Sequence, residues 1–377
     1  MSDTRKTTKP NVPNLRFPGF EGEWELKKLS AYLYENKERN RNGEFNKSDV
    51  LSVSGDCGIV NQIELLGRSF AGKSVADYHV VRTDDIVYTK SPLKEYPYGI
   101  VKYNNGQDGI VSTLYAVYHH KDNVDGQFVE YYFTNPQRTN RYFKPIVRIG
   151  AKHDMKIGNE EALDSFVVFP GLEEQRKITE MLSLLDLRIA IQNKVIEKYE
   201  SLIKALCQIL ITSPNGTVCH IGDVLKIGSG KDHKHLNIGT IPVFGTGGYM
   251  LSVNDWLYEG ESVCIGRKGT IDNPFFVDGK FWTVDTLFYT YDFNGVLPKF
   301  CYYLFRTINW LQYNEASGVP SLSKSTIERI QIRIPCMDEQ AKAVQVLDGV
   351  EMEITCRRKL LNLYKSIKQY LISQLFI

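Results

Sequence analysis

The sequence lacks several features that would define its class at once. No apolar run among its 377 residues approaches the length of about 18 needed to cross a bilayer, and the polar first residues lack the apolar core of a signal peptide. Its seven cysteines form no Cys-x-x-Cys pair and are odd in number, which favours reduced thiols in a cytoplasm. A net charge of +2 does not by itself indicate a nucleic-acid partner, although a local basic surface fits within such a total. We therefore expect a cytoplasmic protein of two or three globular domains.

An internal repeat organises the chain. Residues 169–175 (FPGLEEQ) correspond to residues 334–340 (IPCMDEQ), and the correspondence continues without a gap to the last residue, so that Tyr199 matches Tyr364. Such self-similarity fixes the architecture before any single motif is weighed.

Each copy of the repeat predicts one long helix. Its apolar residues recur at alternating steps of four and three, the a/d pattern of a coiled coil sustained over about four to five heptads. Pro170 and Pro335 stand just before the helices, and acidic residues follow in each first turn, where the helix dipole favours negative charge. A helix of ~40 residues is roughly 60 Å long.

We expect these two helices to pack lengthwise on each other through an apolar seam. Three polar positions interrupt it: Gln192, its counterpart Arg357, and Lys368. The predicted seam consists of Ile178, Leu182, Leu185, Ile189, Ile196, Tyr199, Ile203, Leu206 and Leu210 in the first helix, and of Ala343, Leu347, Val350, Ile354, Leu361, Tyr364, Leu371 and Leu375 in the second.

The segments before the helices predict two globular domains of mixed α/β character. Short runs rich in Val, Ile, Tyr and Phe alternate there with Gly, Asn and Asp clusters, as strands alternate with turns. The two domains repeat only in outline; for instance, residues 128–133 correspond to residues 300–305. The predicted order is a disordered tail (1–14), a first domain (15–169), a first helix (170–213), a second domain (214–334) and a second helix (335–377).

Three motifs suggest catalysis or cofactor binding, and each is incomplete. Gly228-Ser229-Gly230-Lys231 resembles a phosphate-binding loop, but Leu225 stands where the motif needs glycine and Asp232 where it needs Ser or Thr. The glycine loop at 244–248 leads into no long helix that would set its N-terminus on a phosphate, and Asp272-Asn273-Pro274-Phe275 lacks the second proline of the amino-methyltransferase tetrapeptide. Two histidines in Asp232-His233-Lys234-His235 have no further ligand at a recognisable interval, so no metal site is predicted.

Basic residues on glycine-flanked loops are the candidate DNA contacts. Loops of this kind approach a DNA backbone closely, and arginine pairs with guanine in a bidentate way. Any one of these residues, taken singly, is equally well explained as an exposed charge without a role. The candidates are Arg68, Lys73, Lys90, Lys94, Arg148, Lys152 and His153 in the first domain, and Lys231, His233, Lys234, His235, Arg267, Lys268 and Lys324 in the second.

The arrangement resembles one family, the specificity subunit (HsdS) of type I restriction–modification systems. The resemblance covers nearly the whole chain from Leu15. It rests on the Pro-x-x-(Glu/Asp)-Glu-Gln openings at 170–175 and 335–340, on the entry phrases at 24–29 and 220–224, and on the segments around Gly150 and Gly318. The segment from 150 to 163 fits the family less well than its counterpart, which leaves the end of the first domain less defined.

The resemblance implies an α+β fold with two target-recognition domains separated by two long spacer helices, which pair as an antiparallel coiled coil. It implies a non-catalytic subunit of a DNA-methylating host-defence complex, in which each domain recognises one half of a bipartite DNA site. The expected partners are two methylation (HsdM) subunits and restriction (HsdR) subunits. This chain would bind no cofactor, while the partners use S-adenosylmethionine, ATP and Mg. The main alternative is a tandem-domain scaffold or binding protein for a non-DNA ligand, and the remaining alternative is an enzyme.

Overall fold

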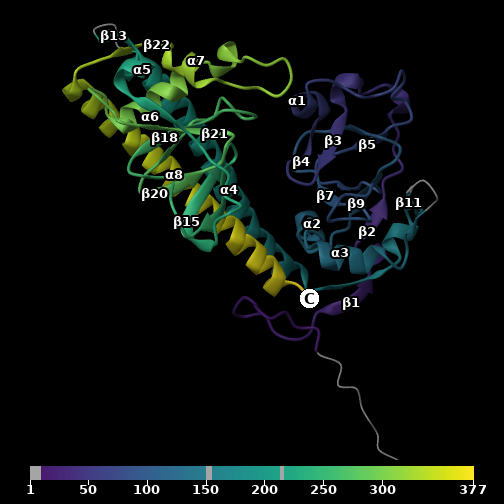
Figure 1. The fold of residues 1–377 in the computed structure, drawn as a ribbon. Coiled ribbons are helices and arrows are strands. Elements are labelled where there is room, and N and C mark those ends of the chain that lie inside the picture. Colours follow the sequence, from purple (N-terminus) through teal and green to yellow (C-terminus); the bar gives the residue numbers. More distant parts are fainter. Residues whose placement is uncertain (1–9, 150–154, 213–215) are drawn as a thin grey trace, which may run out of the picture. The chain divides into compact units, whose positions relative to one another are not determined.

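The computed structural model describes residues 10–149, 155–212 and 216–377. The chain divides into two compact units, each of which combines one globular domain with parts of both long helices. Unit 1 contains Met1–Ala190 and Asn362–Ile377, and unit 2 contains Ile191–Leu361. The sequence colours of Figure 1 identify these segments.

The first domain is built from short antiparallel strands and short helices. A four-stranded sheet has the order β2-β9-β6-β7, and the pairs β1–β12, β3–β4, β5–β8 and β10–β11 surround it. Its elements are β1 (Glu25–Lys28), β2 (Leu33–Glu35), β3 (Leu51–Ser54), β4 (Gly58–Asn61), α1 (Gln62–Leu66), β5 (His79–Val81), β6 (Ile86–Tyr88), β7 (Val101–Tyr103), β8 (Gly109–Val111), β9 (Ala116–His120), α2 (Gly126–Phe133), α3 (Pro136–Phe143), β10 (Arg148–Ile149), β11 (Met155–Lys156) and β12 (Phe166–Phe169), with 3-10 turns at Leu29–Ala31, Asn40–Asn42, Lys47–Asp49 and Glu161–Leu163.

The second domain contains two four-stranded sheets, β14-β21-β18-β19 and β16-β15-β20-β17, and the pair β13–β22. All its pairings are antiparallel except β15 with β20. Its elements are β13 (Thr217–His220), α5 (Ile221–Val224), β14 (Lys226–Ser229), β15 (Ile238–Gly245), β16 (Gly248–Val253), β17 (Tyr258–Glu259), β18 (Ser262–Gly266), β19 (Phe275–Val277), β20 (Lys280–Thr283), β21 (Leu287–Tyr291), α6 (Pro298–Thr307), a 3-10 turn (Trp310–Tyr313), α7 (Lys324–Glu328) and β22 (Gln331–Ile334).

The two domains share one closing device. In each, the first strand pairs antiparallel with the strand that leads into a long helix: β1 with β12, and β13 with β22. One helix of each domain, α2 or α6, then packs its aromatic side chains against the long helices, as Phe128 and Phe300 do in the two cores. The α+β fold predicted from the sequence is confirmed.

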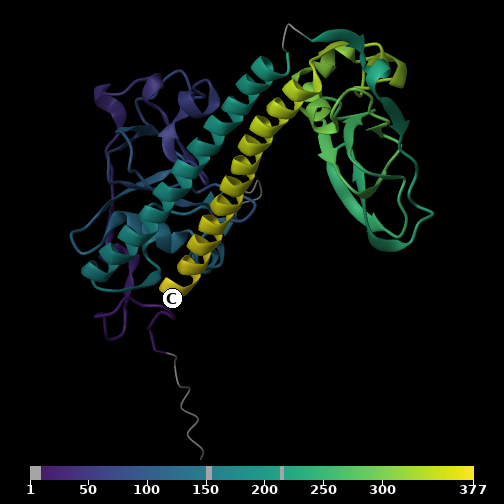
Figure 2. The same cartoon turned by 90° about the vertical axis from the view of Figure 1, so that its left-hand side faces the viewer.

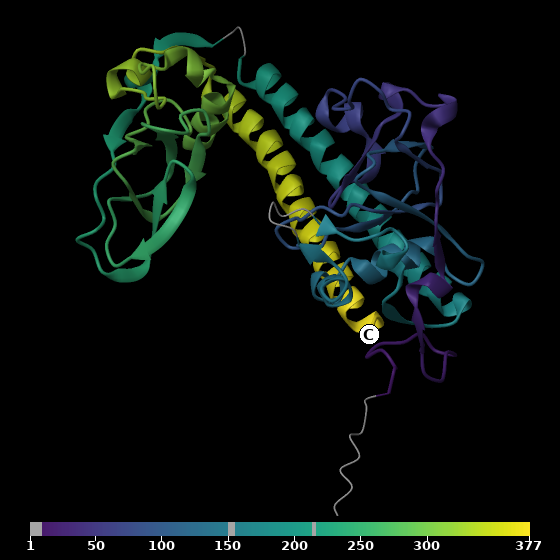
Figure 3. The same cartoon turned by 90° about the vertical axis from the view of Figure 1, so that its right-hand side faces the viewer.

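The long helices are α4 (Leu172–Leu210) and α8 (Met337–Leu375). Within each unit they run side by side in opposite directions, as Figures 2 and 3 show from two sides. The start of α4 packs with the end of α8 in the first core, through Leu182 and Leu375. The end of α4 packs with the start of α8 in the second core, through Cys207 and Leu347.

The structure buries or half-buries every position of the predicted seam. The two basic interruptions have partners. Lys368 forms an ion pair with Asp186 of α4, and its ammonium lies 5.2 Å from the centroid of the Tyr131 ring. Arg357 forms an ion pair with Glu353 one turn earlier, at 2.7 Å. Gln192 is buried, and its Oε1 has no hydrogen-bond partner among the described residues.

A repeated glutamine joins each domain to its long helix. The backbone N–H of Asp125, the N-cap of α2, donates to Oε1 of Gln175 at 3.0 Å, and Nε2 of Gln175 donates to the carbonyl oxygen of Pro170 at 2.9 Å. Gln340 makes the same pair of bonds with Leu297, the N-cap of α6, at 2.8 Å and with Pro335 at 2.9 Å. The two glutamines occupy the same position of the internal repeat because each accepts a hydrogen bond from the N-cap residue of a domain helix, α2 or α6.

Residues 10–14, predicted as part of a disordered tail, lie against the first domain. The backbone N–H of Trp24 donates to the carbonyl oxygen of Asn11 at 2.8 Å, and Pro13 is buried. The segment has few apolar residues, so its sequence gives no sign of the backbone hydrogen bonds that hold it against the domain. Residues 1–9 of that tail lie outside the described residues.

Candidate nucleic-acid interface

One end of the second domain is organised by residues 283–287, the segment between β20 and β21. The backbone N–H of Lys231 donates to the carbonyl oxygen of Thr283 at 2.8 Å, and that of Val284 donates to Phe244 in β15 at 3.0 Å. The backbone N–H of Arg267 donates to the carbonyl oxygen of Thr286 at 2.8 Å. The 283–287 segment thus holds together the end of β15 and two loops that carry predicted DNA contacts.

Glycine permits the close approach of these loops. A Cβ atom on Gly230 would lie 1.9 Å from the carbonyl oxygen of Val284, which no other residue type would tolerate. The next loop is held in the same way from its other side, because the N–H of Gly269 donates to the carbonyl oxygen of Pro320 at 2.9 Å. Lys268 also forms a β-bridge with Ser321. The Lys231, Arg267–Lys268 and Pro320–Lys324 segments are therefore neighbours.

Most basic side chains of this end have no acidic partner among the described residues. Lys231, Lys234, Arg267 and Lys268 are exposed and take part in no ion pair of the described chain. Lys324 lies 3.6 Å from Glu328 on the same helix. Unpaired cations fixed on rigid backbone are suited to phosphate oxygens, which supply the missing counter-charge.

The histidines of this end differ in their surroundings. His235 lies edge-on to Trp282, with ring centroids 5.7 Å apart, and the indole N–H of Trp282 donates to the carbonyl oxygen of Lys231 at 2.8 Å. His233 is half-buried. The carboxylates of Asp232 and Asp285 are exposed beside the cations, so this end is mixed in charge with a basic excess.

The candidates of the first domain lie on separate loops. Arg68 and Lys73 are exposed after α1, and the guanidinium of Arg68 lies 4.6 Å from the centroid of the Phe70 ring. Lys90 donates to Oδ1 of Asn159 at 2.6 Å, and burial lowers its pKa. No hydrogen bond or ion pair of the described residues joins the first loop to the second. In Figure 1, α1 lies at the end of this domain away from α2 and α3.

Three further candidates complete the first domain. Lys94 is exposed on the loop between β6 and β7, and Arg148 is exposed in β10. Lys152 and His153 lie outside the described residues. The basic candidates of this domain are therefore less concentrated than those of the second.

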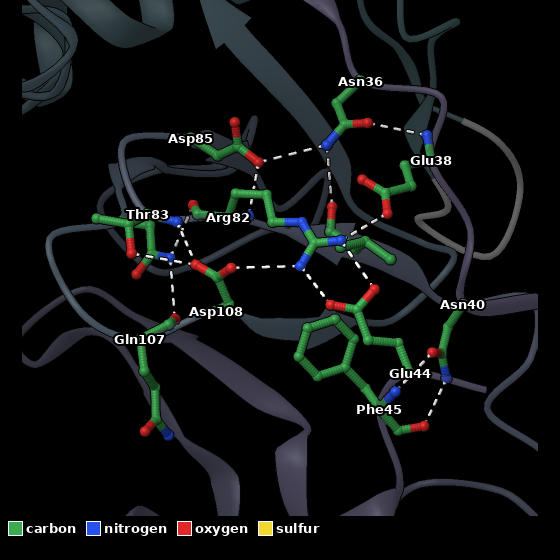
Figure 4. A network of polar contacts seen from close by, with 12 residues as sticks. Asn36, Glu38, Asn40, Glu44, Phe45, Arg82, Thr83, Asp85, Gln107 and Asp108 are labelled. Atoms are coloured by element: carbon green, nitrogen blue, oxygen red, sulfur yellow. Dashed lines mark hydrogen bonds and ion pairs between the residues drawn. The ribbon is translucent and has the colours of Figure 1, made fainter. Parts of the chain in front are cut away.

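Arg82 in the same domain is an arginine whose guanidinium is fully used in contacts within the protein (Figure 4). Its guanidinium binds Glu44 at 2.5 and 2.9 Å, Glu38 at 2.7 Å and Asp108 at 3.3 Å. Hydrogen bonding to these carboxylates, Glu44 first, raises the pKa of Arg82. The three carboxylates already neutralise the guanidinium of Arg82, and the surface around it is acidic, so it is unsuited to binding DNA phosphates.

The described residues, which omit 1–9, 150–154 and 213–215, offer no cluster of three or more His, Cys, Asp or Glu side chains fit to hold a metal. Within the same ranges no helix combines the length and hydrophobicity required to span a membrane.

Comparison with known proteins finds a family match in the second domain. Residues 216–363 match the model of the "Type I restriction modification DNA specificity domain". This part of the chain is therefore similar to that family. The match covers the basic loops of the second domain described above, together with most of α8.

Two curated relatives give the same result over shorter segments. A type I restriction enzyme EcoprrI specificity subunit from Escherichia coli is 22% identical over 136 residues, 34% of each chain. A putative type I restriction enzyme specificity subunit, S.HindORF215P from Haemophilus influenzae, is 24% identical over 116 residues, 30% of each chain. The matched segments thus span about a third of the length of these relatives.

Solved structures extend the likeness to the whole fold. A type I restriction–modification S subunit from M. genitalium has a TM-score of 0.65 at 15% identity and covers 97% of this chain and 99% of its own. A chain from a study of complex assembly and conformational transition of the type I R-M system has a TM-score of 0.50 at 12% identity, covering 97% and 99%. The predicted resemblance to the type I specificity subunit (HsdS) is confirmed.

Proposed function

We propose that this chain is the sequence-specific DNA-binding subunit of a type I restriction–modification complex, in which each domain recognises one half of a bipartite site. The observation that carries the proposal is the group of unpaired cations around residues 283–287, which lies within the DNA specificity domain. Arg267 and Lys268 lie where backbone bonds fix both sides of their loop, so little backbone conformational entropy is lost when they bind.

In the first domain, the proposal assigns DNA contact to the loops of Arg68 and Lys73 and of Lys90 and Lys94. Arg82 is excluded because three carboxylates already match its charge. The difference between the two domains in the placement of cations supports recognition of two different half-sites.

The helices serve as the spacer in this proposal. Each has 39 residues, and at about 1.5 Å per residue this gives a stiff element of roughly 58 Å. Half-sites about one helical turn of DNA apart require such an element to convert their separation into specificity.

We assign the exposed apolar positions of the helices to the docking of methylation subunits. Leu184 and Leu187 in unit 1, and Leu202 and Ile209 in unit 2, lie off the seam and are exposed. The chain itself is non-catalytic; the methylation subunits would supply S-adenosylmethionine chemistry, and restriction subunits would use ATP and Mg.

The experiment is a genome-wide map of modified adenines in cells with and without this gene. We expect one two-part motif with a fixed gap that disappears on deletion. A map unchanged by deletion, in cells where a methylation subunit copurifies with the chain, would contradict the proposal. Absence of any copurifying methylation subunit would instead favour a tandem scaffold for another ligand.

A further inference from the structure

The hairpin of β15 and β16 presents a compact apolar tip. Its strands meet at Gly245 and Gly248 around a two-residue turn, and the register shifts between Val243 and Phe244. Val243 pairs with Leu251 and Phe244 with Tyr249, so Met250 is the extra residue of a β-bulge. Bulges of this kind turn side chains out of the regular alternation and occur often beside functional sites.

Three consecutive apolar residues follow the turn without cover. Tyr249 is 64% exposed, Met250 52% and Leu251 38%. A run of exposed apolar residues on a strand promotes aggregation unless it binds something. Within this segment, a hydrogen bond of 3.1 Å joins Oη of Tyr249 to Oγ of Ser252.

The tip adjoins the basic loops. A Cβ atom on Gly269 would lie 3.7 Å from Oγ1 of Thr246 in the hairpin turn, and Gly269 follows Arg267 and Lys268 directly. A Cβ atom on Gly245 would lie 2.7 Å from Sδ of Met250 and 3.6 Å from Cγ2 of Val284. Exposed apolar surface and unpaired positive charge therefore meet at one place on one rigid domain.

We propose that the tip of the β15–β16 hairpin enters the major groove of the DNA, where Tyr249 and Met250 contact base edges and determine specificity for one half-site. The major groove admits a two-stranded ribbon, and apolar side chains there distinguish thymine by its methyl group. Arg267 and Lys268 beside the tip bind the flanking phosphates and fix its depth. This inference rests on the proposed function, and it adds residues that a search for basic loops does not find.

The test compares Tyr249→Ser and Met250→Ser with Ile238→Ser. Ile238 is 96% exposed at the far end of the same hairpin, so its substitution removes similar exposed apolar surface away from the tip. Each full-length variant is expressed with its methylation subunits, the modified adenines are mapped, and the affinity of the purified complex is measured for the wild-type site and for a scrambled duplex.

We expect each tip variant to relax the motif at one or two positions within a single half and to lower the ratio of specific to scrambled affinity about tenfold, as loss of one base contact does. The Ile238→Ser variant should keep the wild-type motif and ratio. An unchanged motif in both tip variants would overturn the inference, and so would an equal loss of affinity for both duplexes. Loss of methylation subunits from the complex would show that the tip binds protein instead. Absence of any bipartite motif in the wild type is a different result, which overturns the proposed function itself.

Discussion

The buried glutamine of each repeat gives the sharpest test of how the domains are attached to the helices. Gln340 is fully buried, and its side chain accepts from the N–H of Leu297 at 2.8 Å and donates to Pro335 at 2.9 Å and to Gly295 at 3.0 Å. Replacing it with alanine removes three hydrogen bonds and leaves the N–H of Leu297 without its acceptor. Each bond contributes about 1 kcal/mol, and water can reach the partly buried Leu297, so we expect a loss of about 2–3 kcal/mol.

Thermal unfolding of the full-length chain measures this loss in the transition of unit 2. For a unit of this size about 1 kcal/mol corresponds to about 2–4 °C, so the melting temperature should fall by about 5–10 °C. Hydrogen exchange at the Leu297 amide and in the first turn of α6 should accelerate. Gln345→Ala is the matched control, since Gln345 is exposed on the same helix. If the two variants melt within 1 °C of each other, the glutamine does not hold α6 and the explanation of the repeat is wrong.

Three further predictions concern DNA binding, the helix seam and pH. Arg267→Ala should weaken binding to cognate and scrambled duplexes alike and reduce the slope of log affinity against log salt concentration by about 1. The control Lys226→Ala removes a cation that is already paired with Asp292, and it should change neither the affinities nor the slope. A loss of affinity confined to the cognate duplex would contradict phosphate contact by Arg267. Leu185→Asp places a charge among residues of the first core, so it should destabilise unit 1 by about 3 kcal/mol or more and abolish binding to the bipartite site. Leu187 is 56% exposed on the same helix, and Leu187→Asp should change the stability of unit 1 by no more than about 0.5 kcal/mol. If the Leu185→Asp variant keeps its preference for the spacing of the half-sites, the spacer role is refuted. Burial, with smaller contributions from Arg39 and Lys90, lowers the pKa of His79 from 6.5 to about 4, so the stability of unit 1 should be complete above about pH 6.5 and fall as the pH decreases toward 4. His79→Leu should remove up to about 3 kcal/mol of that dependence in denaturant titrations at several pH values, and identical pH profiles for the two proteins would show that His79 is not the group responsible.

The long helices could be predicted almost to the residue because their pattern is local. The heptads between 170 and 212 produced α4 (Leu172–Leu210), and the same holds for α8. The partner of Lys368 could not be predicted, since Asp186 is distant in the sequence and only the antiparallel pairing of the helices brings the two together. Short strands rich in Val and Ile, such as β18 (Ser262–Gly266), were also predictable.

The closing strand β1 was missed for a physical reason. All four residues of β1 (Glu25–Lys28) are exposed, so the strand lacks the apolar alternation from which strands are recognised. Its backbone pairing with β12 is a long-range contact without a local pattern.

For the candidate interface, residue type was predictable and clustering was not. Glycine-flanked Arg267 and Lys268 could be nominated from sequence, but their proximity to Lys231 depends on the 283–287 segment, which binds both loops through backbone atoms. Tyr249 and Met250 were overlooked because the preceding glycines suggested a cofactor loop. The three apolar residues directly after the turn were the available indication.

Unit 1 is discontinuous, and this has a consequence for synthesis and for genetic exchange. The ring centroids of Phe376 and Phe128 lie 5.1 Å apart, and Nε of Arg138 donates to the backbone oxygen of Ile377 at 3.1 Å. Residues 362–377 therefore complete a core that begins near the start of the chain. A ribosome delivers all of unit 2 before it delivers these residues, and the first domain stays incomplete until then. Recombination within 217–333 replaces one continuous segment and leaves the first core intact. Exchange of either domain alone separates it from residues of both long helices that fill its core, Leu182 and Leu375 in the first core and Cys207 and Leu347 in the second. The first domain differs in that part of its core is synthesised last, so an exchanged first domain must fit residues from the distant end of the chain.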